Sequence, residues 1–395
     1  MPAVTLRVIV LLVGLITSLF VGQVGGSDIL GKFAFFLFAS SFIADLSKFA
    51  TDQLNLRILY EKEHDASFWV HDTLIAQVKA LAICCCLIPW FGYFESAILF
   101  LNASAIVLSR SLLPLWVFSG QRAFGLVKRE AMITGLRAAS FLPTLLFIAE
   151  TDQFFLFSSI LFYVFTVLIF ILVVTQNKII SLSIVRLSSV GLHFKNFPFY
   201  LSTAPVALTS FLVSASLKDQ GNFEILSIYY VLSRMFSFVN IFQVLSINHY
   251  NLDVLEKLRE NKKISKFRLK IMFQSMLILL GIFMMLSAFG AEILKLWGLN
   301  SELPLFLIVY FIFVYVALAV SGPWFVVVSF FDSKEVLFRW SSALCIVLLC
   351  SFFLISNLYF LILALGAILA TDRIFKLIFS IRLEHENLQE TIRTA

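Results

Sequence analysis

Charged side chains inside long apolar segments are the residues of this chain with the clearest chemical potential. Arg234 lies in the middle of an apolar segment at 225–248, and Arg110 and Arg137 lie in the segments at 96–119 and 131–149. Asp45 and Asp372 are the only carboxylates that we place in such segments, both near the segment ends. A charge there is costly unless it faces a partner or a water-filled cavity. The arginines could therefore bind an anionic ligand, and the carboxylates could bind a coupling ion.

Most of these charges also have a structural interpretation. Arg234 could pair with a buried carboxylate or a backbone carbonyl, and Arg137 could extend its side chain to the lipid headgroups. Asp45 and Lys48 are three residues apart, so they could form a mutual pair on one helical face. The same interpretation applies to the group of charges near the end of the last segment, which comprises Asp372, Arg373 and Lys376.

Twelve apolar segments must position these charges, and each is about as long as the ~20 residues that a helix needs to cross a bilayer. The chain is 60% hydrophobic and 14% charged, with a mean hydropathy of +0.96. The expected fold class is therefore all-α, in a polytopic membrane protein. We place the spans at 4–23, 30–50, 74–93, 96–119, 131–149, 153–175, 197–217, 225–248, 269–290, 304–331, 337–356 and 358–380.

The loops between these segments differ strongly in charge. Loops after even-numbered spans, together with the tail, contain seventeen Lys and Arg residues, whereas loops after odd-numbered spans contain two. Because short cationic loops stay on the cytoplasmic side, both termini are predicted to be cytoplasmic. The first span also resembles a secretory signal, but its apolar run from Val8 to Val24 is long for a cleavable segment, so we expect it to be retained.

A short repeat divides the chain into two halves. Residues 28–33 read Asp-Ile-Leu-Gly-Lys-Phe and residues 224–229 read Glu-Ile-Leu-Ser-Ile-Tyr, each at the start of a span that runs inward. Because six spans separate the copies, both halves have the same orientation and form a parallel repeat. The expected domains are a six-helix bundle at 1–176, a cytoplasmic linker at 177–196, a second six-helix bundle at 197–380 and a cytoplasmic tail at 381–395. Such repeats are typical of transporters.

Several other chemistries lack support in the sequence. The five cysteines and five histidines are too scattered to make a metal site, and we expect no cofactor. The segment from Gly26 to Lys32 approaches a phosphate-binding loop, but Phe33 stands where Ser or Thr is required, so ATP is not an expected ligand. The net charge of +6 is spread over the cytoplasmic loops, which fits anionic lipids better than nucleic acid. An enzyme is not expected.

The order of several motifs resembles that of Wzx-type flippases, the polysaccharide transporter family of the multidrug, oligosaccharidyl-lipid and polysaccharide superfamily. The motifs lie at the entry and the exit of span two, in the loop after span four, at the entry to span seven and within span eight, in the same order as in that family. They are Gly25–Phe33, Thr51–Arg57, Phe118–Phe124, Phe197–Leu201 and Ile228–Arg234.

This resemblance implies a flippase that moves polyprenyl-diphosphate-linked oligosaccharides across a bacterial inner membrane by alternating access. A polysaccharide polymerase would use the product, in the biosynthesis of O-antigen, capsule or exopolysaccharide. The substrate-binding candidates are then Arg234, Arg110, Arg137, Lys48 and Arg57, and the ion-coupling candidates are Asp45 and Asp372.

Two alternatives remain. An ion-coupled multidrug or small-molecule exporter of the same superfamily would use embedded carboxylates and a cavity for amphiphilic drugs. A membrane-bound glycosyltransferase, polymerase or ligase would need a large outer loop with catalytic residues, and the longest predicted outer loop runs only from Ala291 to Leu303.

Overall fold

A computed structural model describes most of the chain. It describes residues 2–49, 66–117, 151–176, 187–259, 265–322 and 334–394, together with Met132 and Gly135. Within these ranges the regular secondary structure is helical and there is no strand. The predicted all-α class is confirmed.

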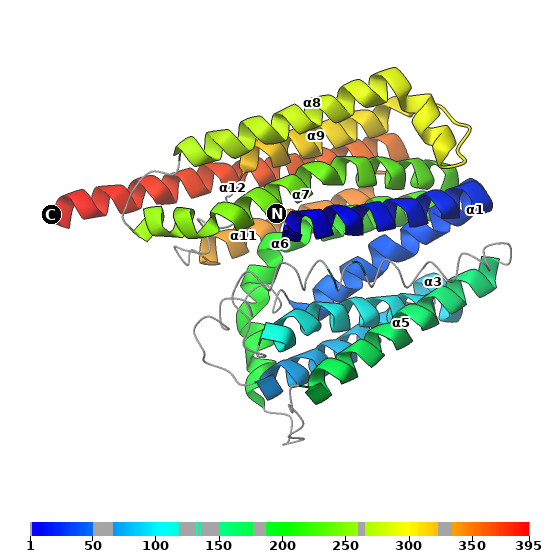
Figure 1. The fold of residues 1–395 in the computed structure, drawn as a ribbon. Coiled ribbons are helices and arrows are strands. Elements are labelled where there is room, and N and C mark those ends of the chain that lie inside the picture. Colours follow the sequence, from blue (N-terminus) through cyan, green and yellow to red (C-terminus); the bar gives the residue numbers. More distant parts are fainter. Residues whose placement is uncertain are drawn as a thin grey trace. The chain divides into compact units, whose positions relative to one another are not determined.

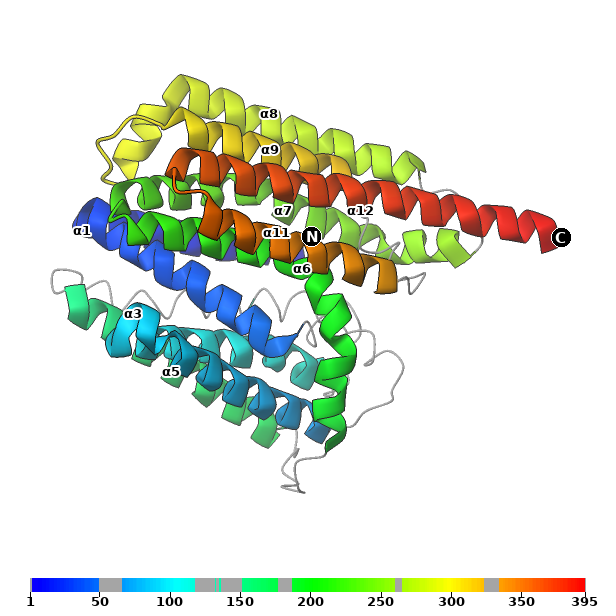
Figure 2. The same cartoon turned by 180° about the vertical axis from the view of Figure 1, so that it is seen from behind.

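The described helices fall into two compact units, and unit 1 comprises Met1–Leu226 with Trp297–Leu299. Its helices are α1 (Pro2–Lys48), α3 (Ala66–Val117), α5 (Thr151–Gln176) and α6 (Leu187–Asp219). Helix α1 packs against α3 and α6, and α3 packs against α5. Figures 1 and 2 both show α3 and α5 side by side.

Unit 2 comprises Ser227–Leu296 and Asn300–Ala395. Its helices are α7 (Phe223–Arg259, whose first turn belongs to unit 1), α8 (Ser265–Leu296), α9 (Leu305–Ser321), α11 (Lys334–Leu354) and α12 (Leu358–Thr394). Helix α9 packs against both α8 and α12, and α11 packs against α12. The start of α12 is capped by Asn357, whose Oδ1 accepts hydrogen bonds from the backbone N–H groups of Tyr359 and Phe360.

Helices α1 and α3 are each interrupted at one glycine. With 47 and 52 residues, straight helices would be about 70 and 78 Å long, more than twice the ~30 Å of a bilayer core. The backbone is not helical at Gly26 (φ 68°, ψ −169°) or at Gly92 (φ 81°, ψ 171°), and such positive φ angles are easily adopted only by glycine. Each helix is therefore two bilayer-length segments, and Figure 1 shows α1 turning back on itself.

Six helices in the described part of the chain are long and apolar enough to cross a membrane: α1, α3, α5, α8, α11 and α12. Helix α9 is a shorter apolar helix. Twelve spans in two repeated bundles therefore stay a prediction. The predicted fifth span, 131–149, lies outside the described residues except for Met132 and Gly135, and α6 begins at Leu187, inside the predicted linker.

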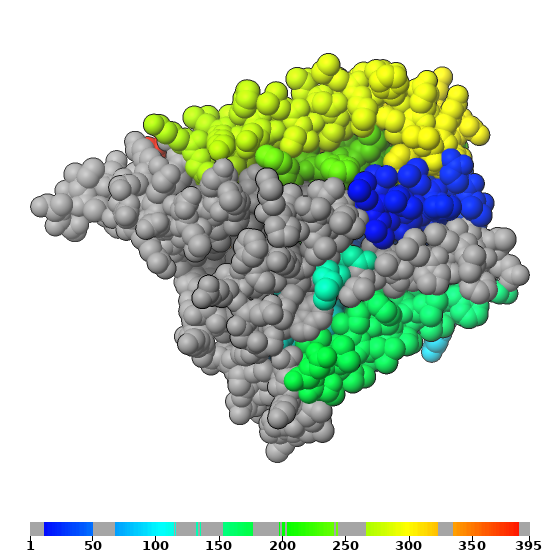
Figure 3. All heavy atoms as spheres, in the orientation of Figure 1, coloured from blue at the N-terminus to red at the C-terminus, as the bar shows by residue number. Residues whose placement is uncertain are grey.

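The outer face of α8 illustrates how apolar these helices are. Large apolar side chains are exposed along most of its length, and the α8 surface is visible along the upper edge of Figure 3. They include Leu269, Phe273, Leu277, Leu280, Met284 and Phe289. A continuous exposed apolar stripe of this kind is suited to contact with lipid chains.

Candidate functional site

Arg234 is the candidate residue with the most unusual surroundings. It follows the start of α7 by eleven residues, which places it about 16 Å along the helix. Its guanidinium lies over the ring of Tyr230, one turn earlier, with 4.8 Å between the guanidinium carbon and the ring centre. The Nε atom is buried and has no hydrogen-bond acceptor among the described residues. Arg234 therefore keeps a charge-assisted donor that a bound acceptor could satisfy.

Tyrosine side chains from α7 and α9 lie close to Arg234. The hydroxyl groups of Tyr229 and Tyr310 are hydrogen-bonded at 3.3 Å, and both residues are buried. The hydroxyl of Tyr315 on α9 is near enough to Arg234 and to Arg373 of α12 to interact electrostatically with both guanidinium groups. Three helices of unit 2 thus bring arginine donors and tyrosine hydroxyls to one region.

Close packing of α9 against α12 helps to hold these tyrosines in place. Gly366 of α12 faces Tyr310, and a Cβ atom at this position would lie 2.7 Å from the Tyr310 ring. The next residue of α9, Phe311, stacks on Phe236 of α7 with the ring centres 5.0 Å apart. These ring contacts connect α9 with α7 and α12 next to the tyrosine hydroxyl groups. Chemically, such a group of donors suits a phosphate or carboxylate ligand.

Asp372 and Lys376 form a buried ion pair on one face of α12. The Lys376 Nζ atom lies 2.6 Å from Asp372 Oδ2, and both side chains are at most 1% exposed. Trp340 of α11 donates a hydrogen bond from Nε1 to the other carboxylate oxygen at 3.2 Å. The predicted pairing among Asp372, Arg373 and Lys376 is confirmed for the aspartate and the lysine. A lysine thus occupies one of the positions at which the Asp372 carboxylate could hold a coupling cation.

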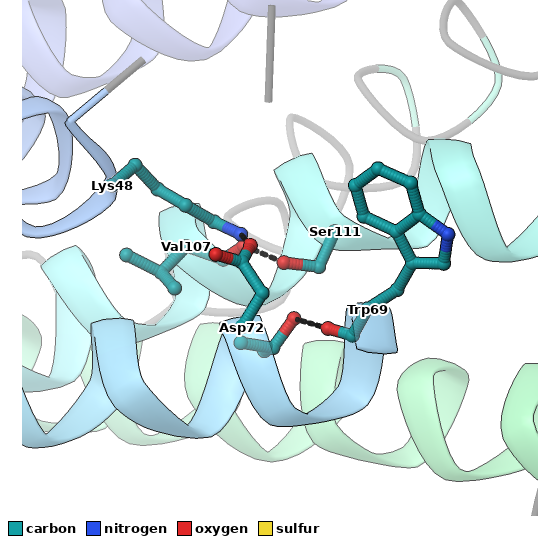
Figure 4. A network of polar contacts seen from close by, with 6 residues as sticks. Lys48, Trp69, Asp72, Val107 and Ser111 are labelled. Atoms are coloured by element: carbon teal, nitrogen blue, oxygen red, sulfur yellow. Dashed lines mark hydrogen bonds and ion pairs between the residues drawn. The ribbon is translucent and has the colours of Figure 1, made fainter. Parts of the chain in front are cut away.

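Lys48 and Asp72 form a second buried ion pair, between α1 and α3. Figure 4 shows the Lys48 amine pointing at the Asp72 carboxylate, with 2.9 Å between Nζ and Oδ2. Both side chains are 1% exposed. The next residue of α3, Thr73, donates a hydrogen bond from Oγ1 to the backbone oxygen of Trp69. Lys48, a substrate-binding candidate, is therefore paired with the carboxylate of Asp72.

Asp45 and Arg110 form another pair between the same two helices. Both side chains are about 30% exposed. The predicted mutual pair of Asp45 with Lys48 is therefore wrong, because α3 packs against α1 and supplies a partner of opposite charge to each of them. The Lys79 ammonium, also on α3, interacts electrostatically with Asp72 and Lys48 and lies 3.5 Å from the ring centre of Phe49.

The remaining candidates are outside the structural description. Arg57 and Arg137 lie outside the described residues. Of the described candidates, unit 1 brings Lys48, Asp45 and Arg110 together at the end of α1, and unit 2 contains Arg234 and Asp372. The predicted roles of all seven residues in substrate binding or ion coupling stay predictions.

Asp72 was missed because the third span was predicted to start at residue 74, whereas α3 starts at Ala66. The expectation that Asp45 and Asp372 are the only carboxylates inside the spans is therefore wrong. One signal was present: Asp72 and Lys79 are seven residues apart, so they lie on the same face of a helix.

Arg268 was predicted to lie in the loop before the ninth span, but it belongs to helix α8. It lies in the first turn of α8 and donates hydrogen bonds to Ser380 Oγ at 2.8 Å and to Glu384 Oε2 at 3.0 Å. All three side chains are buried, so these contacts connect α8 with α12 inside unit 2. The hydropathy pattern gave no signal for this contact, because both charges lie beyond the apolar windows.

No family model, curated protein or solved structure matches this chain.

Proposed function

We propose that this protein is a flippase that moves polyprenyl-diphosphate-linked oligosaccharide units across a bacterial inner membrane. In this proposal twelve spans in two parallel six-helix bundles rock between inward-open and outward-open states, with both termini in the cytoplasm. The lipid tail stays in the bilayer while polar groups of the protein shield the headgroup. The unit emerges on the outer face, where a polymerase uses it, and anionic lipids contact the cationic loops.

The single observation that carries the proposal is that the buried Nε donor of Arg234 has no acceptor among the described residues. A diphosphate cannot cross hydrocarbon without compensating charge, and a guanidinium is well matched to phosphate oxygens because it presents several donors in one plane. The buried Nε of Arg234 has no acceptor among the described residues, and Tyr230 holds the group in place. The resemblance of the sequence motifs to polysaccharide transporters supports the same substrate class.

The buried carboxylates support this proposal over a cation-coupled drug exporter. Asp72 and Asp372 each contact a lysine within hydrogen-bond distance. A carboxylate that coordinates a transported cation needs its oxygens available for that cation. The exporter remains the second candidate, because Asp45 and Asp372 could still serve as coupling groups if their partners move.

Complementation of a flippase-deficient bacterial strain tests the proposal. Native protein should restore polysaccharide on the cell surface, and Arg234→Ala should not, whereas Arg234→Lys should restore part of it. Arg339→Ala is the matched control, because Arg339 is 77% exposed and its ion pair among the described residues is with Glu335 of its own helix. Membrane levels of all variants are compared by immunoblot.

Two outcomes would count against the proposal. Full activity of Arg234→Ala at normal membrane levels would remove Arg234 from the site. If loss of the protein sensitises cells to drugs without accumulation of lipid-linked units on the inner leaflet, the exporter is the better description.

A further inference from the structure

The turn that follows α8 lies against α1 inside unit 1. Helix α8 and the chain from Asn300 onward belong to unit 2, but Trp297–Leu299 between them belong to unit 1. The side chains of Trp297 and Leu299 are 5% and 1% exposed. Trp297 donates a hydrogen bond from Nε1 to the hydroxyl of Ser18 on α1 at 3.3 Å. The connection between α8 and α9 is therefore anchored on α1 by three residues.

Two glycines allow the backbone of this turn to touch the backbone of α1. A Cβ atom at Gly22 would lie 2.3 Å from the backbone oxygen of Trp297, and one at Gly298 would lie 2.5 Å from the backbone oxygen of Gly22. Ser18 and Gly22 are one turn apart on α1, and small residues at this spacing are typical of close contacts between membrane segments. A side chain at either glycine would push the turn away from α1.

A second contact of the same kind lies beyond the break of α1 at Gly26. A Cβ atom at Gly31 would lie 2.5 Å from the backbone oxygen of Phe223, the first residue of α7. Phe223 belongs to unit 1, whereas most of α7 belongs to unit 2. Two segments that lead into unit 2 are thus held on α1, one on each side of its break. The α1 clasp is our name for these two contacts, of Gly22 with the Trp297–Leu299 turn and of Gly31 with Phe223.

The α1 clasp is small and lies near points where the backbone bends. The backbone of α8 is not helical at Phe289 (φ −131°, ψ 21°), eight residues before Trp297. Within the turn, Gly298 has a φ angle of 70°, and on α1 the break at Gly26 is four residues after Gly22. A few loop or helix-end positions of this kind are enough to absorb a hinge movement. Contacts of this size open locally in folded proteins, so the turn can leave α1 while the helices stay intact.

We propose that the α1 clasp is a releasable latch, in which the Trp297–Leu299 turn is seated on α1 in one state and detached from it in another. The seated turn keeps the segments that lead into α7 and α9 against the break of α1. Both segments belong to loops predicted on the outer side of the membrane, so release of the latch opens the outer end of the protein. This use as an outer gate rests on the proposed function, whereas release of the turn is measurable without any substrate.

The rate at which a thiol in the turn reacts with a water-soluble maleimide measures the release. Leu299→Cys and Asn300→Cys are purified separately in lipid nanodiscs without substrate, and modification at each position is followed by peptide mass spectrometry. Asn300 is the reference, because it is the adjacent residue, is exposed and belongs to unit 2. We expect Leu299→Cys to react at least tenfold more slowly than Asn300→Cys, because its thiol is buried in the seated turn. It should still react to completion, because every molecule visits the detached state.

Two matched pairs of glycine variants test whether the backbone contact keeps the turn seated. Gly22→Ala, added to Leu299→Cys, should raise the reaction rate at least tenfold, because the new Cβ atom has no room. Gly14→Ala is its control, since Gly14 lies on the same helix and an added Cβ would have no described atom within 4 Å. Gly298→Ala should act like Gly22→Ala. Its control is Gly221→Ala, because Gly221 has the same φ of 70° and also has no described atom within 4 Å of an added Cβ.

A milder variant keeps the test valid if the glycine variants fail to fold. Trp297→Phe retains most of the buried ring and removes the hydrogen bond to Ser18. It should raise the reaction rate of Leu299→Cys about threefold, as expected for the loss of one hydrogen bond.

Three labelling results would overturn the latch. Leu299→Cys could stay unmodified, which would make the α1 clasp a permanent contact. It could react as fast as Asn300→Cys, which would mean that the turn is not seated. Its rate could be the same with Gly22→Ala as with Gly14→Ala, which would mean that the glycine contact does not hold the turn.

Complementation of a flippase-deficient strain separates the gate from the proposed function. Gly22→Ala should restore less surface polysaccharide than Gly14→Ala at equal membrane levels, because the outer end no longer closes. Equal restoration by both variants, despite faster labelling of Gly22→Ala, would show that the α1 clasp is not a gate. If the native protein itself restores no polysaccharide, the proposed function is wrong and the labelling result still decides whether the turn is released.

Discussion

Each unit contains a buried lysine–aspartate pair, but the two pairs differ in whether they connect two helices. In unit 1 the lysine and aspartate of the buried pair, Lys48 and Asp72, are on different helices, 24 positions apart. In unit 2 Asp372 and Lys376 are one turn apart on α12. Both pairs are withdrawn from solvent to the same degree, with at most 1% exposure of each side chain. Each aspartate also interacts with a second cation, Lys79 in unit 1 and Arg373 in unit 2.

The positions of the paired residues determine which contacts each pair can stabilise. A pair within one helix forms as soon as the helix forms and adds nothing to the contact between helices. The Lys48–Asp72 pair exists only when α1 and α3 are packed together, so it contributes to their packing and would be lost if they separated. We therefore expect unit 1 to be the more sensitive of the two to loss of its carboxylate.

The largest expected effect is that of Asp72→Asn. Removal of one partner from a buried ion pair costs about 3–5 kcal/mol, and here it leaves Lys48 without its contact across the helix interface. The apparent melting temperature of the purified protein in detergent should fall clearly. In the matched variant, Asp372→Asn, the fall should be smaller, because the new amide oxygen still accepts the Trp340 hydrogen bond and α12 stays intact. If the melting temperature fell further in Asp372→Asn than in Asp72→Asn, an ion pair between two helices would not be more important for stability than one within a helix.

A smaller effect is expected when the lysine is replaced instead. In Lys48→Met and in Lys376→Met a second cation still compensates the carboxylate, and methionine fills a similar volume. Replacement of buried ionic groups by apolar ones of similar size is often close to neutral, so we expect a loss of about 1 kcal/mol in each case. Thermal unfolding in the same detergent measures both variants. If Lys48→Met lowers the free energy of unfolding as much as Asp72→Asn does, then Lys79 does not compensate the charge of Asp72.

The smallest effects are expected at the partly exposed and surface pairs. Arg110→Met breaks the contact with Asp45, whose side chain is 29% exposed, so solvent screening limits the loss to about 1 kcal/mol. Arg339→Ala breaks a pair in which both side chains are at least 75% exposed, and should cost less than about 0.5 kcal/mol. Unfolding at low and high salt distinguishes these exposed pairs from the buried ones. Salt should remove the contribution of the exposed pairs to stability and leave that of the buried pairs. A large effect of Arg339→Ala would contradict this ranking.

The same contrast explains how much of the site could be predicted from the sequence. The pairing of Asp372 with Lys376 followed from their spacing along one helix, because helical geometry alone brings such residues together. The pairing of Lys48 with Asp72 required knowledge of which helices pack together, and spacing carries no such information. The spacing indicated Asp45 as the partner of Lys48. In the structure α3 packs against α1, so Lys48 pairs with Asp72 and Asp45 pairs with Arg110.

For the fold, the apolar segments indicated helices throughout, and the breaks at Gly26 and Gly92 lie at or next to predicted segment boundaries. Helix ends were less accurate. Charged and aromatic residues such as Trp69, His71 and Asp72 lower the hydropathy where α3 begins, so the predicted span started eight residues late. For α12 the predicted end at residue 380 omitted the polar continuation to Thr394.

Binding of polyprenyl diphosphate to the purified protein in lipid nanodiscs measures whether Arg234 binds the diphosphate. The native protein, Arg234→Ala and Arg339→Ala are compared by native mass spectrometry over a range of lipid concentrations. In the proposed function Arg234 donates charge-assisted hydrogen bonds to the diphosphate, so we predict that Arg234→Ala binds at least tenfold more weakly than the native protein, the loss expected for about 1.4 kcal/mol. Arg339→Ala should bind like the native protein. Equal binding by Arg234→Ala and the native protein would contradict the account.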